Sequence, residues 1–257
     1  MRARFVGLLA SAALAVTLVV LGCQGQASER ETMLAVAASL RNVTPALISA
    51  YAAKHPGAKI AATYGASGDL QKQVEGGAPI DGVLFASAKP VDALIEKGLA
   101  DAKTRRVLAT NTLVLIGPKG AKPLTFETID AVPATEKIAI GDPGAVPAGQ
   151  YAKVALEKLG KWSAIQGRVV FGGDVAAVLA YARRGEVAAA IVYKTEIRGI
   201  EDVALLAEAS GAWAPRVEVV AGVVKDAKAG AEAAAFLDFV ASPEGQRILG
   251  ELGFGPP

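Results

Sequence analysis

The chain has 257 residues, of which 52% are hydrophobic, and a formal net charge of +2. Its lysines and arginines are scattered, which excludes a nucleic-acid interface of the usual kind, because such an interface needs clustered basic residues. Cys23 is the only cysteine, so no internal disulfide can form and the chain beyond it has no thiol for metal binding or catalysis. The length is sufficient for one large or two small domains with a hydrophobic core.

The first residues are typical of an export signal. Two arginines precede an apolar stretch over 5–21, and Gly22 and Cys23 follow it. A cysteine directly after a small residue at this place is typical of a bacterial lipoprotein, so we expect 1–22 to be a signal peptide and Cys23 to be lipidated. The polar residues 23–32 would form a tether. An ordinary secretory signal and an uncleaved anchor helix are the alternatives, because a membrane span needs ~20 apolar residues.

Apolar runs of strand type alternate with amphipathic helical stretches in the next part of the chain. The pattern predicts strands at 33–37, 59–64 and 83–86 and helices at 43–54, 69–75 and 90–97. This alternation implies a mainly parallel sheet with helices on both faces. Ligands of such sheets bind beyond the carboxyl ends of the strands, where the turns into the helices lie.

A second series of the same kind begins with a strong apolar strand. Its predicted elements are strands at 112–116, 137–140, 169–171 and 188–192 and helices at 150–159 and 175–184. A long apolar strand at 217–224 and a helix at 231–240 follow. Ser242, with Pro243 in the first turn, is expected to cap a closing helix that ends at Gly250.

The two series together predict an α/β protein of two lobes with a ligand cleft between them. Each lobe would be a mainly parallel sheet flanked by helices. We assign residues 33–110 and 225–257 to lobe 1. Residues 111–224, including the two crossover strands, are assigned to lobe 2.

Small residues gather in turns that precede predicted helices. The four turns are Ala37-Ala38-Ser39-Leu40, Gly65-Ala66-Ser67-Gly68-Asp69, Val146-Pro147-Ala148-Gly149 and Gly173-Asp174-Val175. A helix start presents unpaired backbone N–H groups and the positive end of the helix dipole. Several such starts that converge make an anion site without lysine or arginine. The pattern therefore favours a protein that holds a small oxyanion over one that transforms a substrate.

Five motifs follow one another in a fixed order. They are Ala37-Ala38-Ser39-Leu40; Gly141-Asp142-Pro143 with Val146-Pro147-Ala148-Gly149-Gln150-Tyr151-Ala152-Lys153; Gly173-Asp174-Val175; Gly185-Glu186 with Ile191-Val192-Tyr193; and Ser242-Pro243-Glu244-Gly245 with Gly253-Phe254. In this order the chain resembles the periplasmic molybdate-binding proteins of ABC transporters, which are type II solute-binding proteins. The resemblance implies the two-lobed fold of that class and a membrane permease as partner.

The resemblance also implies a set of oxyanion ligands. Ser39 and Ser67 would bind through their side chains, Ala148 and Val175 through their main-chain N–H groups, and Tyr193 through its hydroxyl group. It implies no cofactor and no metal held as a bare cation, because molybdenum would be bound as its oxyanion. Without the resemblance, Ser39 is interpreted as a helix N-cap, Ser67 as part of a tight turn, Val175 as core, and the Tyr193 hydroxyl as bonded to backbone.

One segment departs from the family pattern. Members of this family usually have Asp directly before a short strand that ends in Phe-x-Ser-Ala. Here Asp81 lies two residues earlier and Val83 occupies the expected position. The departure concerns the local loop geometry near the cleft and touches none of the five ligands.

These observations predict an extracytoplasmic, lipid-anchored monomer that captures molybdate, and tungstate with it, and delivers the anion to an ABC importer. A protein for another tetrahedral oxyanion, sulfate above all, is the first alternative. A hydrolase is the second, but the chain has no G-x-S-x-G motif, and its only histidine, His55, is expected in a surface turn. A docking protein that has lost its ligand is the third.

Overall fold

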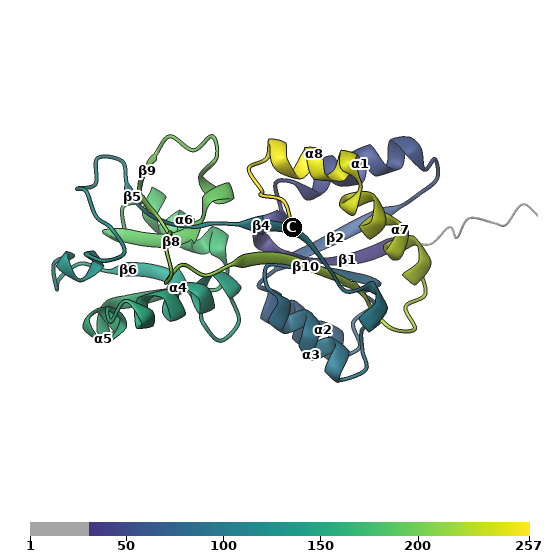
Figure 1. Ribbon diagram of the computed structural model, residues 1–257, viewed down its shortest axis with the longest axis horizontal. Coiled ribbons are helices and arrows are strands. Elements are labelled where there is room, and N and C mark those ends of the chain that lie inside the picture. The colour runs from purple at the N-terminus through teal and green to yellow at the C-terminus, as the bar shows by residue number, and fades with distance from the viewer. Residues whose placement is uncertain (1–30) are drawn as a thin grey trace, which may run out of the picture.

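Two five-stranded sheets, each with helices on both faces, form the two lobes of the molecule (Figure 1). The computed structural model describes residues 31–257. The signal peptide predicted over 1–22, the lipidation site at Cys23 and most of the tether predicted over 23–32 therefore lie outside the described residues. Within the described part, no helix is both long and apolar enough to cross a membrane. The predicted α/β fold of two lobes is confirmed.

The first sheet has the strand order β2-β1-β3-β10-β4. β1 pairs in parallel with β2 and β3, whereas β10 is antiparallel to β3 and β4. The strands are β1 (Thr32–Ala37), β2 (Ile60–Gly65), β3 (Gly82–Phe85), β4 (Arg106–Asn111) and β10 (Val217–Val223). The helices of this lobe are α1 (Thr44–Lys54), α2 (Ser67–Glu75), α3 (Ala88–Glu96), α7 (Gly230–Ala241) and α8 (Pro243–Glu251), with η1 (Ala38–Leu40) and η2 (Ala102–Thr104) as short 3-10 turns.

The second sheet repeats this plan with the order β7-β6-β8-β5-β9. β6 is parallel to β7 and β8, whereas β5 is antiparallel to β8 and β9. The strands are β5 (Leu113–Pro118), β6 (Ile138–Gly141), β7 (Val169–Gly172), β8 (Ala189–Tyr193) and β9 (Val203–Glu208). The helices are α4 (Pro147–Lys158), α5 (Trp162–Ile165) and α6 (Val175–Arg183), with η3 (Ile129–Ala131), η4 (Gln166–Arg168) and η5 (Lys194–Ile197).

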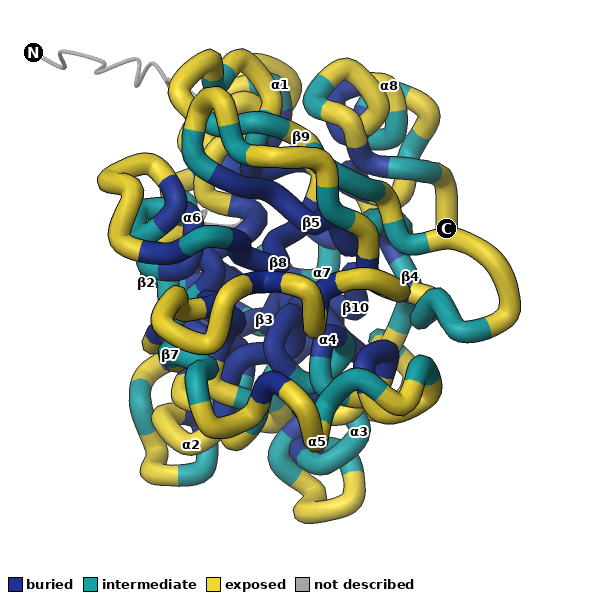
Figure 2. Tube along the Cα trace, turned by 90° about the vertical axis from the view of Figure 1, so that its left-hand side faces the viewer, coloured by how far each residue is buried: buried dark blue, intermediate teal, exposed yellow. Residues whose placement is uncertain are grey.

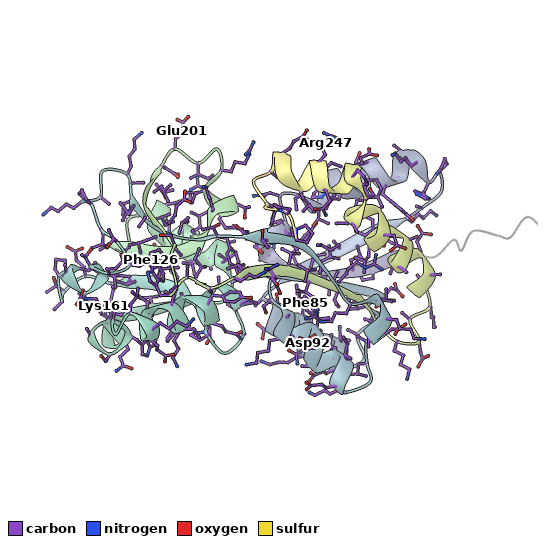
Figure 3. The ribbon with its side chains drawn as sticks, in the orientation of Figure 1. Phe85, Asp92, Phe126, Lys161, Glu201 and Arg247 are labelled. Atoms are coloured by element: carbon purple, nitrogen blue, oxygen red, sulfur yellow. The ribbon has the colours of Figure 1, made fainter. Side chains whose placement is uncertain are left out.

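The central strands are buried on both faces, which explains their continuous apolar sequences. In β1, Leu34 and Val36 belong to one hydrophobic cluster and Ala35 to another, and all three side chains are fully buried. Phe85 and Phe126 mark the cores of the two lobes, and both are fully buried (Figure 3). The tube in Figure 2 shows the same arrangement, with buried strands inside and exposed helix surfaces outside.

The assignment of β10 to lobe 2 was wrong. β10 lies between β3 and β4 in the first sheet. Within residues 31–257, the backbone therefore passes from one lobe to the other at two places, directly after β4 and directly before β10. The sequence of β10 does not reveal its partner, because an apolar strand is buried equally well in either sheet. At the first crossing, the Asn111 side chain donates to Thr195 Oγ1 at 2.9 Å and accepts from the Thr112 N–H at 2.9 Å.

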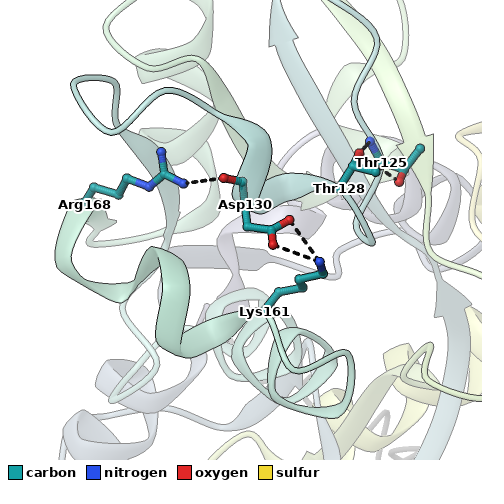
Figure 4. A network of polar contacts seen from close by, with 5 residues as sticks. All are labelled: Thr125, Thr128, Asp130, Lys161 and Arg168. Atoms are coloured by element: carbon teal, nitrogen blue, oxygen red, sulfur yellow. Dashed lines mark hydrogen bonds and ion pairs between the residues drawn. The ribbon is translucent and has the colours of Figure 1, made fainter.

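Polar contacts fasten the outer part of the second lobe (Figure 4). Lys161 Nζ donates to the two carboxylate oxygens of Asp130 at 3.0 and 2.9 Å, and Arg168 donates to the Asp130 carbonyl oxygen at 3.1 Å. The Thr125 N–H donates to Thr128 Oγ1 at 3.0 Å. These charges therefore serve local packing in lobe 2.

Asp81, at the position that departs from the family pattern, holds three segments of the first lobe together. Its carboxylate is 1% exposed and accepts from the Met33 N–H at 2.9 Å and the Ala229 N–H at 3.0 Å. It precedes β3, whereas Ala86, at the other end of that strand, faces the cleft. The departure therefore lies at the end of β3 remote from the cleft.

We predict that Asp81→Ala lowers the free energy of unfolding by about 3 kcal/mol or more, because it leaves two buried N–H groups without their charged acceptor. Asp238→Ala is the matched control, since that carboxylate pairs with Arg106 and its side chain is 66% exposed. An exposed pair contributes about 0–1 kcal/mol. Chemical denaturation of both variants measures the difference, and equal small effects would contradict the role of Asp81.

Candidate functional site

The parallel strands of both sheets end at the interface between the lobes. β1 leads into η1, β2 into α2, β6 into α4 and β7 into α6, while β8 ends at Tyr193. Each turn consists of small residues because the helix start must follow the strand closely. In α4, a Cβ atom on Gly149 would lie 1.9 Å from the carbonyl oxygen of Gly141 in β6. Glycine at position 149 is therefore required for α4 to begin directly against the sheet.

All five residues predicted as oxyanion ligands line one cavity between the lobes. The residues that line it are Ala37, Ala38, Ser39, Gly65, Ala66, Ser67, Ala86, Val146, Pro147, Ala148, Asp174, Val175 and Tyr193. The cavity has a volume of about 10 Å³, which is close to the minimum for one water molecule. An oxyanion can therefore enter from solvent only when the lobes move apart.

Two side chains in the cavity, Ser67 and Tyr193, have hydroxyl groups whose hydrogen atoms are available for donation. Tyr193 is 1% exposed, and its hydroxyl group has no hydrogen-bond partner among the described residues. Burial raises the pKa of Tyr193 well above its usual value, with smaller contributions from Tyr151 and Glu196, so the hydroxyl group keeps its proton. Ser67 Oγ accepts from the Ala86 N–H at 3.2 Å, which leaves the hydroxyl hydrogen of Ser67 available for donation.

The backbone N–H groups of Ala148 and Val175 also have no hydrogen-bond acceptor among the described residues. Ala148 is the second residue of α4 and Val175 the first residue of α6, so neither N–H has an acceptor within its helix. In residues 31–257 no other acceptor bonds to them. Both residues are at most 2% exposed. Buried N–H groups without an acceptor are uncommon, and the dipoles of two helices add a positive potential at this point.

Ser39 lies in η1 and is 6% exposed. Its interpretation as a helix N-cap was wrong, because the N-cap of α1 is Val43 and that of η1 is Ala37, and no side chain caps either element. Asp174 is the N-cap of α6, since its carboxylate accepts from the Ala177 N–H at 2.8 Å. Of the described residues that line the cavity, Asp174 and Tyr193 are the ionisable ones.

A second carboxylate, Glu196, lies in η5 just after Tyr193 and is 8% exposed. The pKa of Glu196 is raised to about 7, chiefly by burial and in part by the nearby Asp174, while Arg41 opposes the shift. Below that pH the group is neutral. Among residues 31–257, no lysine, arginine or histidine lines the cavity, so this part of the chain offers neutral donors there without a cation.

The described residues hold no cluster for metal binding, and the histidine among them lies away from the cavity. Residues 31–257 hold no group of three or more His, Cys, Asp or Glu side chains that could bind a metal ion. His55 is exposed and stacks on Tyr51 with ring centroids 4.1 Å apart. It does not line the cavity.

Two residues that support the site were not predicted. Ala86 directs the Ser67 hydroxyl through its backbone N–H, and Glu196 is a buried carboxyl beside Tyr193. No sequence signal reveals the first, because a backbone donor is independent of residue type. Glu196 lies three residues after the end of a buried strand, which is a weak hint of its burial.

A two-lobed molecule with a cavity of donors between the lobes has the architecture of a solute-binding protein. The chain belongs to the family of bacterial extracellular solute-binding proteins, whose model matches residues 32–255. Among its relatives is the molybdate-binding protein ModA of Haemophilus influenzae. That relative is 34% identical over 239 residues, which cover 91% of this chain and 93% of ModA.

Solved structures show the same fold. The periplasmic molybdate-binding protein of Azotobacter vinelandii has a TM-score of 0.76 at 21% identity, with 88% of this chain and 99% of that chain covered. The sulfate-binding protein SubI of Mycobacterium tuberculosis has a TM-score of 0.72 at 18% identity, with 88% and 86% covered. The predicted resemblance to molybdate-binding proteins is thus confirmed, while the fold alone is shared with a sulfate-binding protein.

We predict that the free energy of unfolding falls as the pH rises from about 4.5 to about 7 and then levels off. In this window Glu196 is ionised in the unfolded chain, where its pKa is near 4.5, but stays protonated in the folded protein. At about 1.4 kcal/mol per pKa unit, the total is roughly 3 kcal/mol. Denaturation across this pH range measures the slope.

Glu196→Gln should remove most of that slope because glutamine is neutral at every pH. The control is Glu201→Gln, since Glu201 is exposed and lies at the outer edge of lobe 2 (Figure 3). A slope that persists in Glu196→Gln would show that another group dominates the pH dependence.

Proposed function

We propose that the protein captures a tetrahedral oxyanion, molybdate in the first place and tungstate with it, and delivers it to an ABC importer. The observation that carries the proposal is one cavity in which five buried residues from both lobes offer donors and no cation. Ser39 and Ser67 would bind from lobe 1. The N–H groups of Ala148 and Val175 and the hydroxyl group of Tyr193 would bind from lobe 2.

The arrangement suits an anion because removal of a dianion from water is costly and many donors must replace its hydration shell. Hydrogen bonds to a charged group contribute about 1.5–3 kcal/mol each. The donors that lack partners, at Ala148, Val175 and Tyr193, would gain acceptors without giving up other bonds. Because the donors lie on both lobes, the anion would favour the closed arrangement.

The donor set also supports selection among anions. Hydrogen phosphate carries an O–H group that needs an acceptor, and an unpaired buried group is penalised. The lining carboxylate of Asp174 already accepts from the Ala177 N–H, and its charge would repel an anion. Sulfate presents acceptors only, as molybdate does, so it would be rejected by size. A sulfate-binding role is the alternative, and the fold shared with a sulfate-binding protein keeps it open.

The remaining parts of the proposal concern the setting of the protein. Lipidation at Cys23 would tether a monomer to the outer face of the cytoplasmic membrane, in the periplasm or its equivalent. The closed form would dock on the permease of the ABC transporter. The family model describes extracellular binding proteins, which supports this location and a binding role without catalysis.

The test is calorimetric titration with molybdate, tungstate, sulfate and phosphate. The chain from Gln24 onward is suitable, because both sheets and both cores lie within residues 31–257. We expect tight binding of molybdate and tungstate with weak or absent binding of sulfate and phosphate. If sulfate binds as tightly as molybdate, the proposed substrate is wrong. If none of the four anions binds, the proposal is overturned.

We predict that Ser39→Ala combined with Ser67→Ala weakens molybdate binding at least tenfold, because two donors to the anion are lost. The fold should remain intact. The control is Ser49→Ala with Ser163→Ala, which removes one exposed hydroxyl group from each lobe. Calorimetric titration of both double variants with molybdate measures the difference. Unchanged affinity in Ser39→Ala with Ser67→Ala would refute the site.

A further inference from the structure

We propose that Gly68 sets the affinity of the site by allowing a backbone latch between the lobes. The Gly68 N–H, in the first turn of α2, donates to the carbonyl oxygen of Ala145 at 2.9 Å. Gly68 belongs to lobe 1 and Ala145 to the loop before α4 in lobe 2. Among residues 31–257, no other backbone hydrogen bond crosses the cleft. The inference rests on the proposed function, because it concerns closure around the bound anion.

The latch lies at the edge of the cavity. Gly68 follows Ser67 directly, and Ala145 precedes Val146, Pro147 and Ala148, all of which line the cavity. The bond therefore joins a loop that supplies a donor from one lobe to a loop that supplies a donor from the other. It also pairs the second N–H of α2 with the opposite lobe, so this N–H is not among the donors left for the anion.

Only glycine fits at this position in the closed arrangement. A Cβ atom on residue 68 would lie 2.8 Å from the Ala145 oxygen and 3.0 Å from its Cα atom. Both contacts are with backbone, so a change of side-chain rotamer cannot relieve them. In the open arrangement the same Cβ atom would face solvent, and alanine is the better helix former.

The loop that carries the Ala145 carbonyl group cannot easily withdraw. The N–H groups of Ala145 and Val146 both donate to the Asp142 carbonyl oxygen, at 3.1 and 2.7 Å, and the Gly144 N–H donates to the Asp142 carboxylate at 2.8 Å. On the other side, Leu70 is 1% exposed and anchors α2 to its lobe. The clash in a Gly68→Ala variant is therefore relieved chiefly by separation of the lobes.

The experiment compares the wild-type chain with Gly68→Ala and with Gly250→Ala as matched control. Gly250 lies in α8, where an added Cβ atom would meet nothing within 4 Å. Calorimetric titration with molybdate and thermal unfolding are measured on all three. We expect Gly68→Ala to bind at least tenfold more weakly and to melt at or above the wild-type temperature. Gly250→Ala should bind like the wild type. Equal affinity in all three proteins overturns the proposal.

Amide hydrogen exchange at Gly68 in the wild-type chain separates this proposal from the proposed function. Protection that rises when molybdate is added supports the latch. If none of the four anions binds, the proposed function fails, and hydrogen exchange at the Gly68 amide of the free protein then tests the latch by itself. Protection of this amide in the free protein would support the latch, and exchange at the rate of an unprotected amide would overturn it. If Gly68→Ala does not fold, hydrogen exchange at Gly68 in the wild-type chain remains the test of the latch.

Discussion

The site depends on one constraint, which is that helix starts leave buried N–H groups without acceptors. The parallel strands of two mixed sheets point their carboxyl ends at the interface between the lobes, where β1, β2, β6 and β7 each turn at once into a helix or a 3-10 turn. The N–H groups of Ala148 and Val175 and the hydroxyl group of Tyr193 are consequently enclosed where no group of residues 31–257 accepts from them. Enclosure of unpaired donors is costly, and under the proposed function an anion supplies the acceptor from outside.

The sequence predicted most of the fold because the central parallel strands are apolar on both faces and small residues mark the turns after them. Two strands at sheet edges, β4 and β9, were not predicted. Their residues are in part exposed, so the periodic apolar signal is weak. The partner of β10 was also assigned wrongly, since pairing between strands far apart in sequence is a tertiary property. Asp81 shows the same limit, because its acceptor role depends on a loop near Ala229.

The candidate site could be predicted residue by residue only with the help of a resemblance. Val175 read alone belongs to the core, and the structure shows that it is indeed buried. The sequence does not reveal that its N–H lacks an acceptor among residues 31–257. Gly68 was visible as a glycine in a turn, but its contact with Ala145 lies across the cleft. The role of such a residue follows from the second lobe, which no local pattern describes.

A latch made of backbone atoms has a consequence for selectivity. Side chains can adjust to anions of different radius, whereas the Gly68 N–H and the Ala145 carbonyl group meet at a fixed distance, held by α2 and by the turn at Asp142. Under the proposed function, the separation of the lobes in the closed state is therefore fixed independently of the anion. An anion that is too small would leave some donors unpaired, and one that is too large would prevent the latch from closing. Size would then be read by closure, while charge and the absence of a proton would be read by the neutral donors.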